Sequence, residues 1–237
     1  MRIVILTTNT LHHCYFTNEL GKRFPIDAVF VESKTINPPF EVHHPYETVR
    51  EEYEQRTWFN NKSADLLDLD HAREFPSLND DDASNTLAQL QPDIVVVFGT
   101  GKLSSDVIGC CPEGILNLHG GDPERDRGLD THLWAIYENR FDDLVTTLHR
   151  VNDQLDDGEV VAKAPMPLYG GMNLHELRRV NTEVCLELVG SALVKYERCG
   201  CISSQPQRTR GRYYSFMPSE LKSTCVQNFE RHTSQLP

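Results

Sequence analysis

Three polar side chains fall where a folded chain could use them for chemistry. Asn117 and His119 are two residues apart in an apolar segment, so a strand would point both side chains to the same face. Two glycines follow directly and let the chain turn away without covering that face. Asp156 comes later, in an acidic turn over residues 155–158. Together, an amide, an imidazole and a carboxylate could stabilise negative charge on a carbonyl oxygen and move a proton.

Each of these residues also has an ordinary structural explanation. A histidine at a strand end is more often a hydrogen-bonded core residue than a catalytic one. An Asp-Asp-Gly sequence such as 156–158 is often only a turn, and an asparagine near a strand end often bonds loop backbone. Taken singly, the three residues leave both interpretations open.

The segments around these residues predict an α/β fold with parallel strands. The predicted strands cover residues 2–6, 27–31, 93–98, 114–119, 144–151 and 159–164. A helix with Phe16 and Leu20 on its inner face should stop before Pro25. A short helix is expected at 84–90, and a long one should follow the capping residue Asn173. Open sheets of this kind bind ligands at the carboxyl ends of their strands, which is where the amide and the imidazole fall.

The length of 237 residues fits one domain of ordinary size with a small addition. We expect the main domain to cover residues 1–200 and a short C-terminal extension to cover 201–237. Within the extension, residues 211–217 should add a strand or an ordered segment. Residues 33–82 have no clear pattern, and we expect an irregular or partly helical excursion there.

Composition excludes several classes of function. The formal net charge of −12 would repel a phosphodiester backbone, so we expect no nucleic-acid partner. The apolar run at the N-terminus is too short for a signal peptide or a membrane span. Seven cysteines without a Cys-x-x-Cys pair, and no other metal-ligand spacing, predict reduced thiols and no metal site. We therefore expect a cytoplasmic protein.

The usual nucleotide motifs are absent. No G-x-G-x-x-G follows the first predicted strand, which argues against a dinucleotide site. The sequence Gly-Thr-Gly-Lys at 99–102 lacks the four-residue spacer of a phosphate-binding loop, and Leu103 replaces its Ser or Thr.

The sequences Ile-Leu-Asn-Leu-His at 115–119 and Leu-Asp-Asp-Gly at 155–158 together resemble the signature of the folate-dependent formyltransferases. The resemblance implies a mostly parallel, Rossmann-like twisted sheet with flanking helices, and a catalytic triad of Asn117, His119 and Asp156. N10-formyltetrahydrofolate would be the formyl donor, and no metal would be required. Asn117 and His119 would donate hydrogen bonds to the formyl oxygen. Asp156 would orient or charge-stabilise the imidazole and help remove the amine proton.

By the same resemblance, the folate would lie along two loops, one after the strand at 93–98 and one before the acidic turn. The implied contact residues are Phe98, Gly99, Thr100, Lys102, Leu103, Arg150, Asn152 and Asp153. Backbone groups of these loops would bind the pterin ring.

Residues 119–124, 127–134 and 211–218 most resemble the small bacterial sugar N-formyltransferases. Those enzymes formylate amino-dideoxyhexoses carried on a nucleotide, commonly dTDP, for surface polysaccharide such as lipopolysaccharide O-antigen. The implied acceptor contacts are Thr8, Asn9, His12, Asp130, Tyr213 and Tyr214. A helix N-terminus also explains the first three without a ligand, and a half-buried strand also explains the two tyrosines. Relatives are often dimers, so we expect a homodimer.

Other functions remain open. Phosphoribosylglycinamide formyltransferase fits the size, and a non-catalytic folate-binding module would keep the fold without turnover. The residues after Gly200 are too few for the tRNA-gripping barrel domain of methionyl-tRNA formyltransferase. A nucleotide-sugar dehydratase is disfavoured because the glycine fingerprint is missing.

Overall fold

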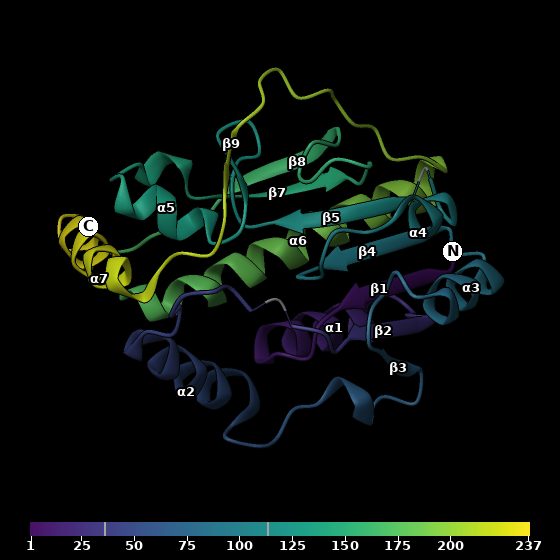
Figure 1. The fold of residues 1–237 in the computed structure, drawn as a ribbon, viewed down its shortest axis with the longest axis horizontal. Coiled ribbons are helices and arrows are strands. Elements are labelled where there is room, and N and C mark those ends of the chain that lie inside the picture. Colours follow the sequence, from purple (N-terminus) through teal and green to yellow (C-terminus); the bar gives the residue numbers. More distant parts are fainter. Residues whose placement is uncertain (36, 113) are drawn as a thin grey trace.

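The computed structural model describes residues 1–35, 37–112 and 114–237, and a seven-stranded sheet runs through the molecule. Its strands lie in the order β3-β2-β1-β4-β5-β7-β8 (Figure 1). Neighbouring strands from β3 to β5 are parallel, whereas β7 is antiparallel to both β5 and β8. The strands are β1 (Ile3–Thr7), β2 (Ala28–Glu32), β3 (Ala72–Phe75), β4 (Ile94–Phe98), β5 (Ile115–His119), β7 (Val145–Arg150) and β8 (Val160–Pro165). The predicted mostly parallel α/β sheet is therefore confirmed.

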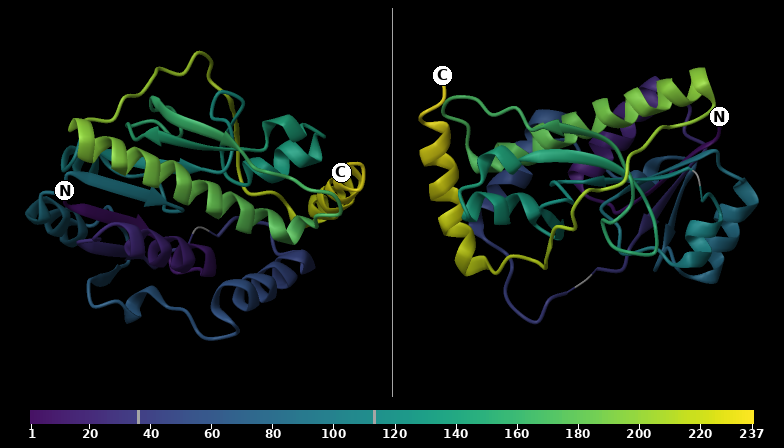
Figure 2. Two further views of the ribbon diagram at one scale, coloured as in Figure 1. Left: turned by 180° about the vertical axis from the view of Figure 1, so that it is seen from behind. Right: turned by 90° about the horizontal axis from the view of Figure 1, so that it is seen from above.

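Helices cover both faces of this sheet. On one face lie α1 (Leu11–Arg23) and α6 (Leu177–Cys199), and on the other lie α3 (Asp81–Leu90) and α4 (Ser105–Gly109) (Figure 2). Alternate residues of β4 enter the two buried layers, and a strand buried on both faces needs an apolar residue at every position. No helix among the described residues is both long and apolar enough to cross a membrane.

The first and the last long helices of the sheet layers begin and end as their sequences predict. Phe16 and Leu20 of α1 are fully buried. Asn173 and Glu176 bond each other's backbone at the start of η3 (Leu174–Glu176), which leads directly into α6. Gly200 then ends α6 with φ of 68°, a left-handed conformation that favours glycine.

Residues 33–82 contain more regular structure than the sequence indicates. They form α2 (Pro45–Phe59), the short η1 (Leu66–Asp68) and the edge strand β3. Glu54 is the one fully buried side chain of α2, so this helix has no apolar stripe by which its sequence could be recognised.

The C-terminal residues return to the region that follows β5. There β9 (Arg212–Tyr214) pairs in parallel with β6 (Asp126–Gly128), so the strand expected within 211–217 is confirmed. Helix α7 (Ser219–Thr233) packs against α5 (Thr131–Tyr137), which precedes the short η2 (Phe141–Asp143). The division of the chain at residue 200 stays a prediction.

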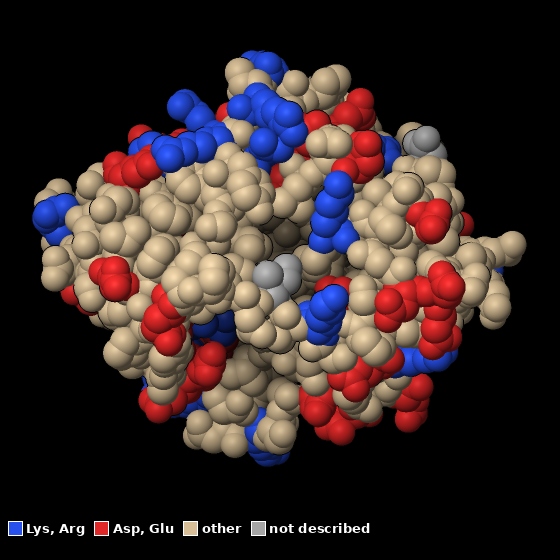
Figure 3. Space-filling model, in the orientation of Figure 1, with Lys and Arg blue, Asp and Glu red and all other residues tan. Residues whose placement is uncertain are grey.

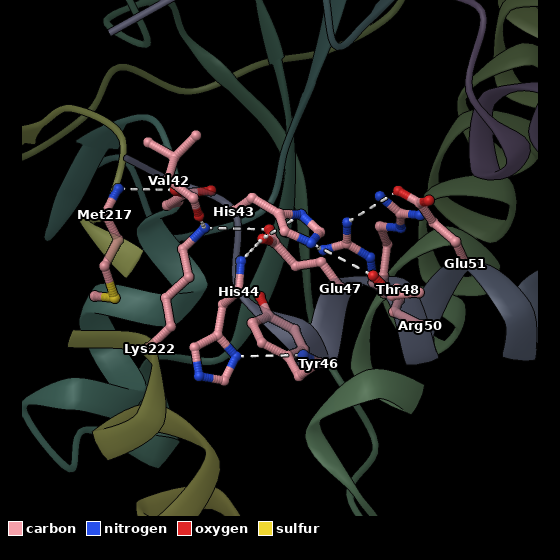
Figure 4. Close-up of polar contacts among 12 residues, drawn as sticks. Val42, His43, His44, Tyr46, Glu47, Thr48, Arg50, Glu51, Met217 and Lys222 are labelled. Carbon is pink, nitrogen blue, oxygen red and sulfur yellow. Dashed lines mark hydrogen bonds and ion pairs between the residues drawn. The ribbon is translucent and has the colours of Figure 1, made fainter. Parts of the chain in front are cut away.

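A buried lysine joins α7 to the segment before α2. Lys222 is 2% exposed, and its ammonium donates to the carbonyl oxygen of Val42 (2.6 Å) and to Glu47 (3.1 Å) (Figure 4). Glu47 also accepts from the backbone N–H of His44, the capping residue of α2. One carboxylate therefore serves both the start of α2 and the attachment of α7.

Candidate active site

A cavity of about 410 Å³ lies beside the carboxyl ends of β4 and β5. The molecular surface is hollowed over these strand ends, with basic side chains next to the hollow (Figure 3). A volume of this order is typical of small-molecule sites. The predicted catalytic residues Asn117, His119 and Asp156 all line this cavity.

Asn117 is fixed by a partner across the sheet. His149 of β7 lies directly opposite it in the antiparallel register, and Asn117 Nδ2 is 3.0 Å from His149 Nε2. His149 Nδ1 lies 2.7 Å from the carbonyl oxygen of Arg150, which can only accept, so Nδ1 carries the proton and Nε2 is the acceptor. Asn117 therefore donates one amide hydrogen to His149 and keeps the other for the cavity.

His119 is buried between two acceptors. Its Nε2 lies 3.0 Å from the carbonyl oxygen of Asp126, and its Nδ1 lies 3.7 Å from Asp156 Oδ2. The Asp126 side chain accepts from Arg140 at 2.7 Å, which holds this segment against the imidazole. Each ring nitrogen thus has an oxygen acceptor on its side, a backbone carbonyl at Nε2 and a carboxylate at Nδ1.

Asp156 is buried among groups that stabilise its negative charge. Burial on its own would raise the pKa of this carboxyl, but the imidazole of His119 and the N–H of Gly128 outweigh it and lower the pKa from 3.8 to about 2. The Gly128 N–H donates to Oδ2 at 2.7 Å, and His149 Nε2 lies 3.6 Å from Oδ1. Asp156 is therefore an anion at neutral pH.

Gly128 is required where it stands. Its φ is 95°, and a side chain would place a Cβ 2.1 Å from the carbonyl oxygen of Tyr214 in β9. Only glycine fits both the conformation and the contact. The pairing of β6 with β9 thereby brings the Gly128 N–H to Asp156.

The structure brings most of the predicted folate-contacting residues to the cavity. Phe98, Gly99, Thr100, Lys102, Leu103 and Asn152 line it. Arg150 instead points to the chain after α6, donating to Ser204 Oγ (2.8 Å) and to the carbonyl oxygen of Ile202 (2.6 Å). Asp153 is exposed and lies outside the cavity lining. Arg150 points away from the cavity because side chains alternate along a strand, and the neighbouring His149 lies on the side of β7 that faces the site.

Some of the residues predicted to contact the acceptor line the cavity, and others lie outside it. His12 and Asp130 line the cavity, and Asp130 Oδ2 also accepts from the Met217 N–H at 2.8 Å. Thr8 bonds His13 at 2.9 Å behind the lining, and Asn9 bonds Asp65 at 2.7 Å in a neighbouring cavity.

The two predicted stacking tyrosines lie outside the cavity lining. Tyr214 is 7% exposed, stacks on Trp134 at 4.9 Å and donates to Glu138 at 3.0 Å. Tyr213 is 55% exposed. The pair instead fits the alternative explanation, a half-buried strand. In β9 the ring of Tyr214 points inward and the ring of Tyr213 points outward, as strand alternation requires.

The lining residues that were not singled out from the sequence include His149, Arg178 and Asn181. The first could have been found only from the register of β7 against β5, and the other two only from the docking of α6. No three His, Cys, Asp or Glu side chains in residues 1–35, 37–112 and 114–237 form a group that could hold a metal ion.

The sequence model of the formyl transferase family matches residues 33–184, which include Asn117, His119 and Asp156. The chain belongs to this family. Its signature sequence and the geometry of its cavity thus coincide in the same part of the fold.

Two curated members of the formyl transferase family are similar in sequence. Methionyl-tRNA formyltransferase of Akkermansia muciniphila is 35% identical over 120 residues, 48% of this chain and 38% of that protein. Phosphoribosylglycinamide formyltransferase of Escherichia coli is 30% identical over 144 residues, 54% of this chain and 67% of that protein. The chain thus spans well under half of the first relative's length.

A solved structure has the same fold over nearly the whole chain. It is the formyltransferase PseJ from Anoxybacillus kamchatkensis, in complex with UDP-4,6-dideoxy-4-formamido-L-AltNAc and tetrahydrofolate. The TM-score is 0.56 with 16% identity, and 97% of each chain is covered. At this identity the likeness shows the fold alone.

Proposed function

We propose that this protein transfers a formyl group from N10-formyltetrahydrofolate to the primary amine of a nucleotide-linked amino-dideoxy sugar. The observation that carries the proposal is the convergence of Asn117, His119 and Asp156 in one cavity of a formyl transferase family member. Their separation in sequence is bridged by β5, by the left-handed turn at Asp156 (φ 50°) and by the Gly128 contact.

The residues present fit a folate formyl donor. The loop over 98–103 lines the same cavity as Asn117, and so do Val151, Asn152, Gln154 and Leu155. Backbone groups and the buried ring of Phe98 therefore lie beside the catalytic amide. Bound there, N10-formyltetrahydrofolate would supply the formyl carbon. The PseJ complex, which contains tetrahydrofolate, supports this assignment by its similar fold.

The three residues have complementary parts in the reaction. Asn117 donates its free amide hydrogen to the formyl oxygen as that oxygen gains negative charge, and His149 keeps the amide from rotating. His119, protonated or polarised by Asp156, adds positive charge at the same place. Asp156 balances that charge and stays ionised, because a carboxyl with a pKa of about 2 is a weak base. The bond between formyl carbon and N10 breaks as the bond to the acceptor nitrogen forms, and the amine proton leaves to water or to N10.

The choice of acceptor rests on the comparisons with known proteins and on the net charge. The PseJ complex holds a UDP-linked formamido sugar, which favours a nucleotide-linked sugar over other amines. The E. coli relative favours glycinamide ribonucleotide as the second candidate. The net charge of −12 disfavours tRNA, although the Akkermansia relative is named for it.

The deciding experiment incubates purified protein with N10-formyltetrahydrofolate and a panel of amines, with product mass as the readout. The panel holds dTDP-linked and UDP-linked 3-amino and 4-amino dideoxyhexoses and glycinamide ribonucleotide. We expect a formyl mass increment on one nucleotide sugar, abolished by His119→Ala and kept by His71→Ala, which removes an exposed histidine. Formylation of glycinamide ribonucleotide alone would replace the acceptor. Tetrahydrofolate binding without any product would establish the non-catalytic folate module.

A further inference from the structure

One side of the cavity is formed by residues to which the sequence assigns no role. Gly120 follows β5 directly, His132 comes from α5, and Arg178 and Asn181 are three residues apart on α6. Residues three apart on a helix share a face, so Arg178 and Asn181 reach the cavity side by side.

Neither the backbone conformation nor the packing requires a glycine at position 120. Its φ is not in the left-handed region that requires glycine. A Cβ built on it would meet only Asn181 Nδ2 at 3.7 Å, Asn181 Oδ1 at 4.0 Å and His132 Nδ1 at 4.0 Å, which are ordinary contact distances. By contrast, a Cβ on Gly121 would stand 2.7 Å from Thr131 Oγ1. The packing therefore demands glycine at position 121, whereas at 120 glycine only leaves space beside His119.

Asn181 directs donors into that space. The amide of Asn181 is oriented so that its Oδ1 accepts from the buried hydroxyl of Thr146 at 2.6 Å. Its Nδ2 group is then the end that faces Gly120 and the cavity. An acceptor of hydrogen bonds on a bound molecule, such as a sugar hydroxyl or a phosphate oxygen, matches it.

Arg178 supplies a fixed positive charge next to these donors. Its Nε donates to Glu54 Oε1 at 2.6 Å and its Nη2 to Glu54 Oε2, a carboxylate that is fully buried in α2. Among residues 1–35, 37–112 and 114–237, no hydrogen-bond acceptor is found for Nη1. A guanidinium held on one edge in this way can present the other edge to an anion.

Two other basic groups, Arg50 and His132, lie near this end of the cavity. Arg50 is largely buried, its Nε has no partner among the described residues, and its guanidinium lies 3.7 Å from Glu47 and 3.9 Å from Glu51 (Figure 4). Burial, with help from Arg50 and Arg178, lowers the pKa of His132 to about 3, so this imidazole is neutral. Among the residues that line this end of the cavity, Arg178 therefore carries the positive charge.

Arg178 also lines a second cavity of about 760 Å³. Asn9, Gln55 and Asn61 offer polar side chains there, and the exposed Glu51, Glu52 and Arg56 line it as well. A molecule longer than one sugar ring could therefore extend from His119 past Arg178 into this second space.

We infer that Gly120, Asn181 and Arg178 form the acceptor site, in which a ring-sized amine lies against Gly120 and a phosphate group bonds Arg178 and Asn181. This rests on the proposed function and adds the residues that hold the sugar ring and the phosphate of the acceptor. The part beyond the phosphate, if the acceptor has one, occupies the second cavity.

Three variants test this site. Gly120→Ala adds one methyl group to the space beside His119, with Gly109→Ala as matched control because a Cβ there meets nothing within 4 Å. Asn181→Asp keeps the bond from Thr146 but turns a carboxylate toward the phosphate. Glu54→Gln with Arg178→Gln removes the cation without leaving its buried partner charged.

Each protein is assayed with a dTDP-linked amino dideoxyhexose, with the same amino sugar 1-phosphate and with the free amino sugar. Since one methylene group is worth tenfold or more in a pocket, we expect Gly120→Ala to raise KM for the nucleotide sugar about tenfold. Asn181→Asp and the Glu54/Arg178 double variant should each raise KM about tenfold for both phosphorylated acceptors and little for the free sugar. Tetrahydrofolate binding should be unchanged in all variants.

Binding of the dTDP-linked sugar in the presence of tetrahydrofolate, measured by calorimetry, separates this inference from the proposed function. Binding that the three variants weaken, without turnover in the wild type, would support the site and overturn the activity. Turnover or binding that none of them changes relative to Gly109→Ala would overturn the site. A wild-type protein that neither binds nor formylates any of the three compounds would overturn both. Unequal effects on the 1-phosphate and the dTDP-linked sugar would tell whether the second cavity takes part.

Discussion

Asn117 and His149 lie opposite each other on β5 and β7, and the amide of the first donates to the imidazole of the second at 3.0 Å. The bond joins two neighbouring strands of the sheet and is partly buried, so the amide cannot turn without losing it. His149 is therefore a positioning residue for the group that meets the formyl oxygen.

We predict that His149→Ala lowers kcat by tenfold to roughly a hundredfold, because the catalytic amide is no longer held in one orientation. Asn117→Ala should cost about a hundredfold or more. The double variant should be no slower than Asn117→Ala, since His149 acts through Asn117. Steady-state kinetics with a fixed folate concentration measures all three. Losses that multiply in the double variant would show that His149 acts independently.

The pH dependence of stability should show the buried charge of Asp156. Its pKa falls from 3.8 when unfolded to about 2 when folded, so its contribution is complete above about pH 4 and disappears as the pH drops toward 2. The shift corresponds to roughly 2 kcal/mol at neutral pH. Urea unfolding of wild type and Asp156→Asn between pH 3 and pH 7 should therefore give a difference that shrinks on the acid side.

Asp157→Asn is the control for this measurement. Asp157 is the next residue of the same turn and pairs with the exposed Arg210 at 3.3 Å, and surface pairs contribute little. A difference between wild type and Asp156→Asn that stays constant from pH 7 to pH 3 would contradict the ionised, buried carboxylate.

Sequence patterns predicted the three catalytic candidates because each depends on short-range information. Asn117 and His119 share a face through the two-residue period of a strand, and the sheet places that strand end beside the cavity. Asp156 followed from the family signature. His149 depends on the register between two strands far apart in sequence, and no local pattern contains that register.

The same limit explains what was misplaced. Arg150 is next to His149, so strand alternation turns it away from the site toward Ser204. Helix α2 has Glu54 as its one fully buried side chain, which leaves no apolar period to recognise. The sequence therefore could not predict that Arg178 lines the cavity, because Arg178 is held by the carboxylate of Glu54 from that helix.

Gly128→Ala should damage both stability and activity. The new Cβ would stand 2.1 Å from the Tyr214 carbonyl oxygen at a φ of 95°, so β6 must separate from β9. We expect a loss of at least about 2 kcal/mol in the free energy of unfolding. The Gly128 N–H would then no longer reach Asp156, and kcat should fall even where the variant is folded. Denaturant unfolding and kinetics, with Gly109→Ala as the neutral control, measure both effects. Full activity in Gly128→Ala would mean that Asp156 does not need this contact.

The attachment of α7 depends on one buried ammonium group. Lys222→Met removes the donor to the Val42 carbonyl oxygen and the cation that lies 3.1 Å from Glu47, so we expect a loss of roughly 3 kcal/mol in the free energy of unfolding. Lys62→Met, which changes an exposed lysine, should alter stability by less than about 0.5 kcal/mol. Adding Glu47→Gln to Lys222→Met should restore part of the loss, because a neutral amide still caps α2 but no longer needs a buried partner charge.

Thermal unfolding of the wild type and the three variants measures these differences in stability. A double variant less stable than Lys222→Met would mean that the carboxylate is stabilised by other groups, such as Arg50 at 3.7 Å.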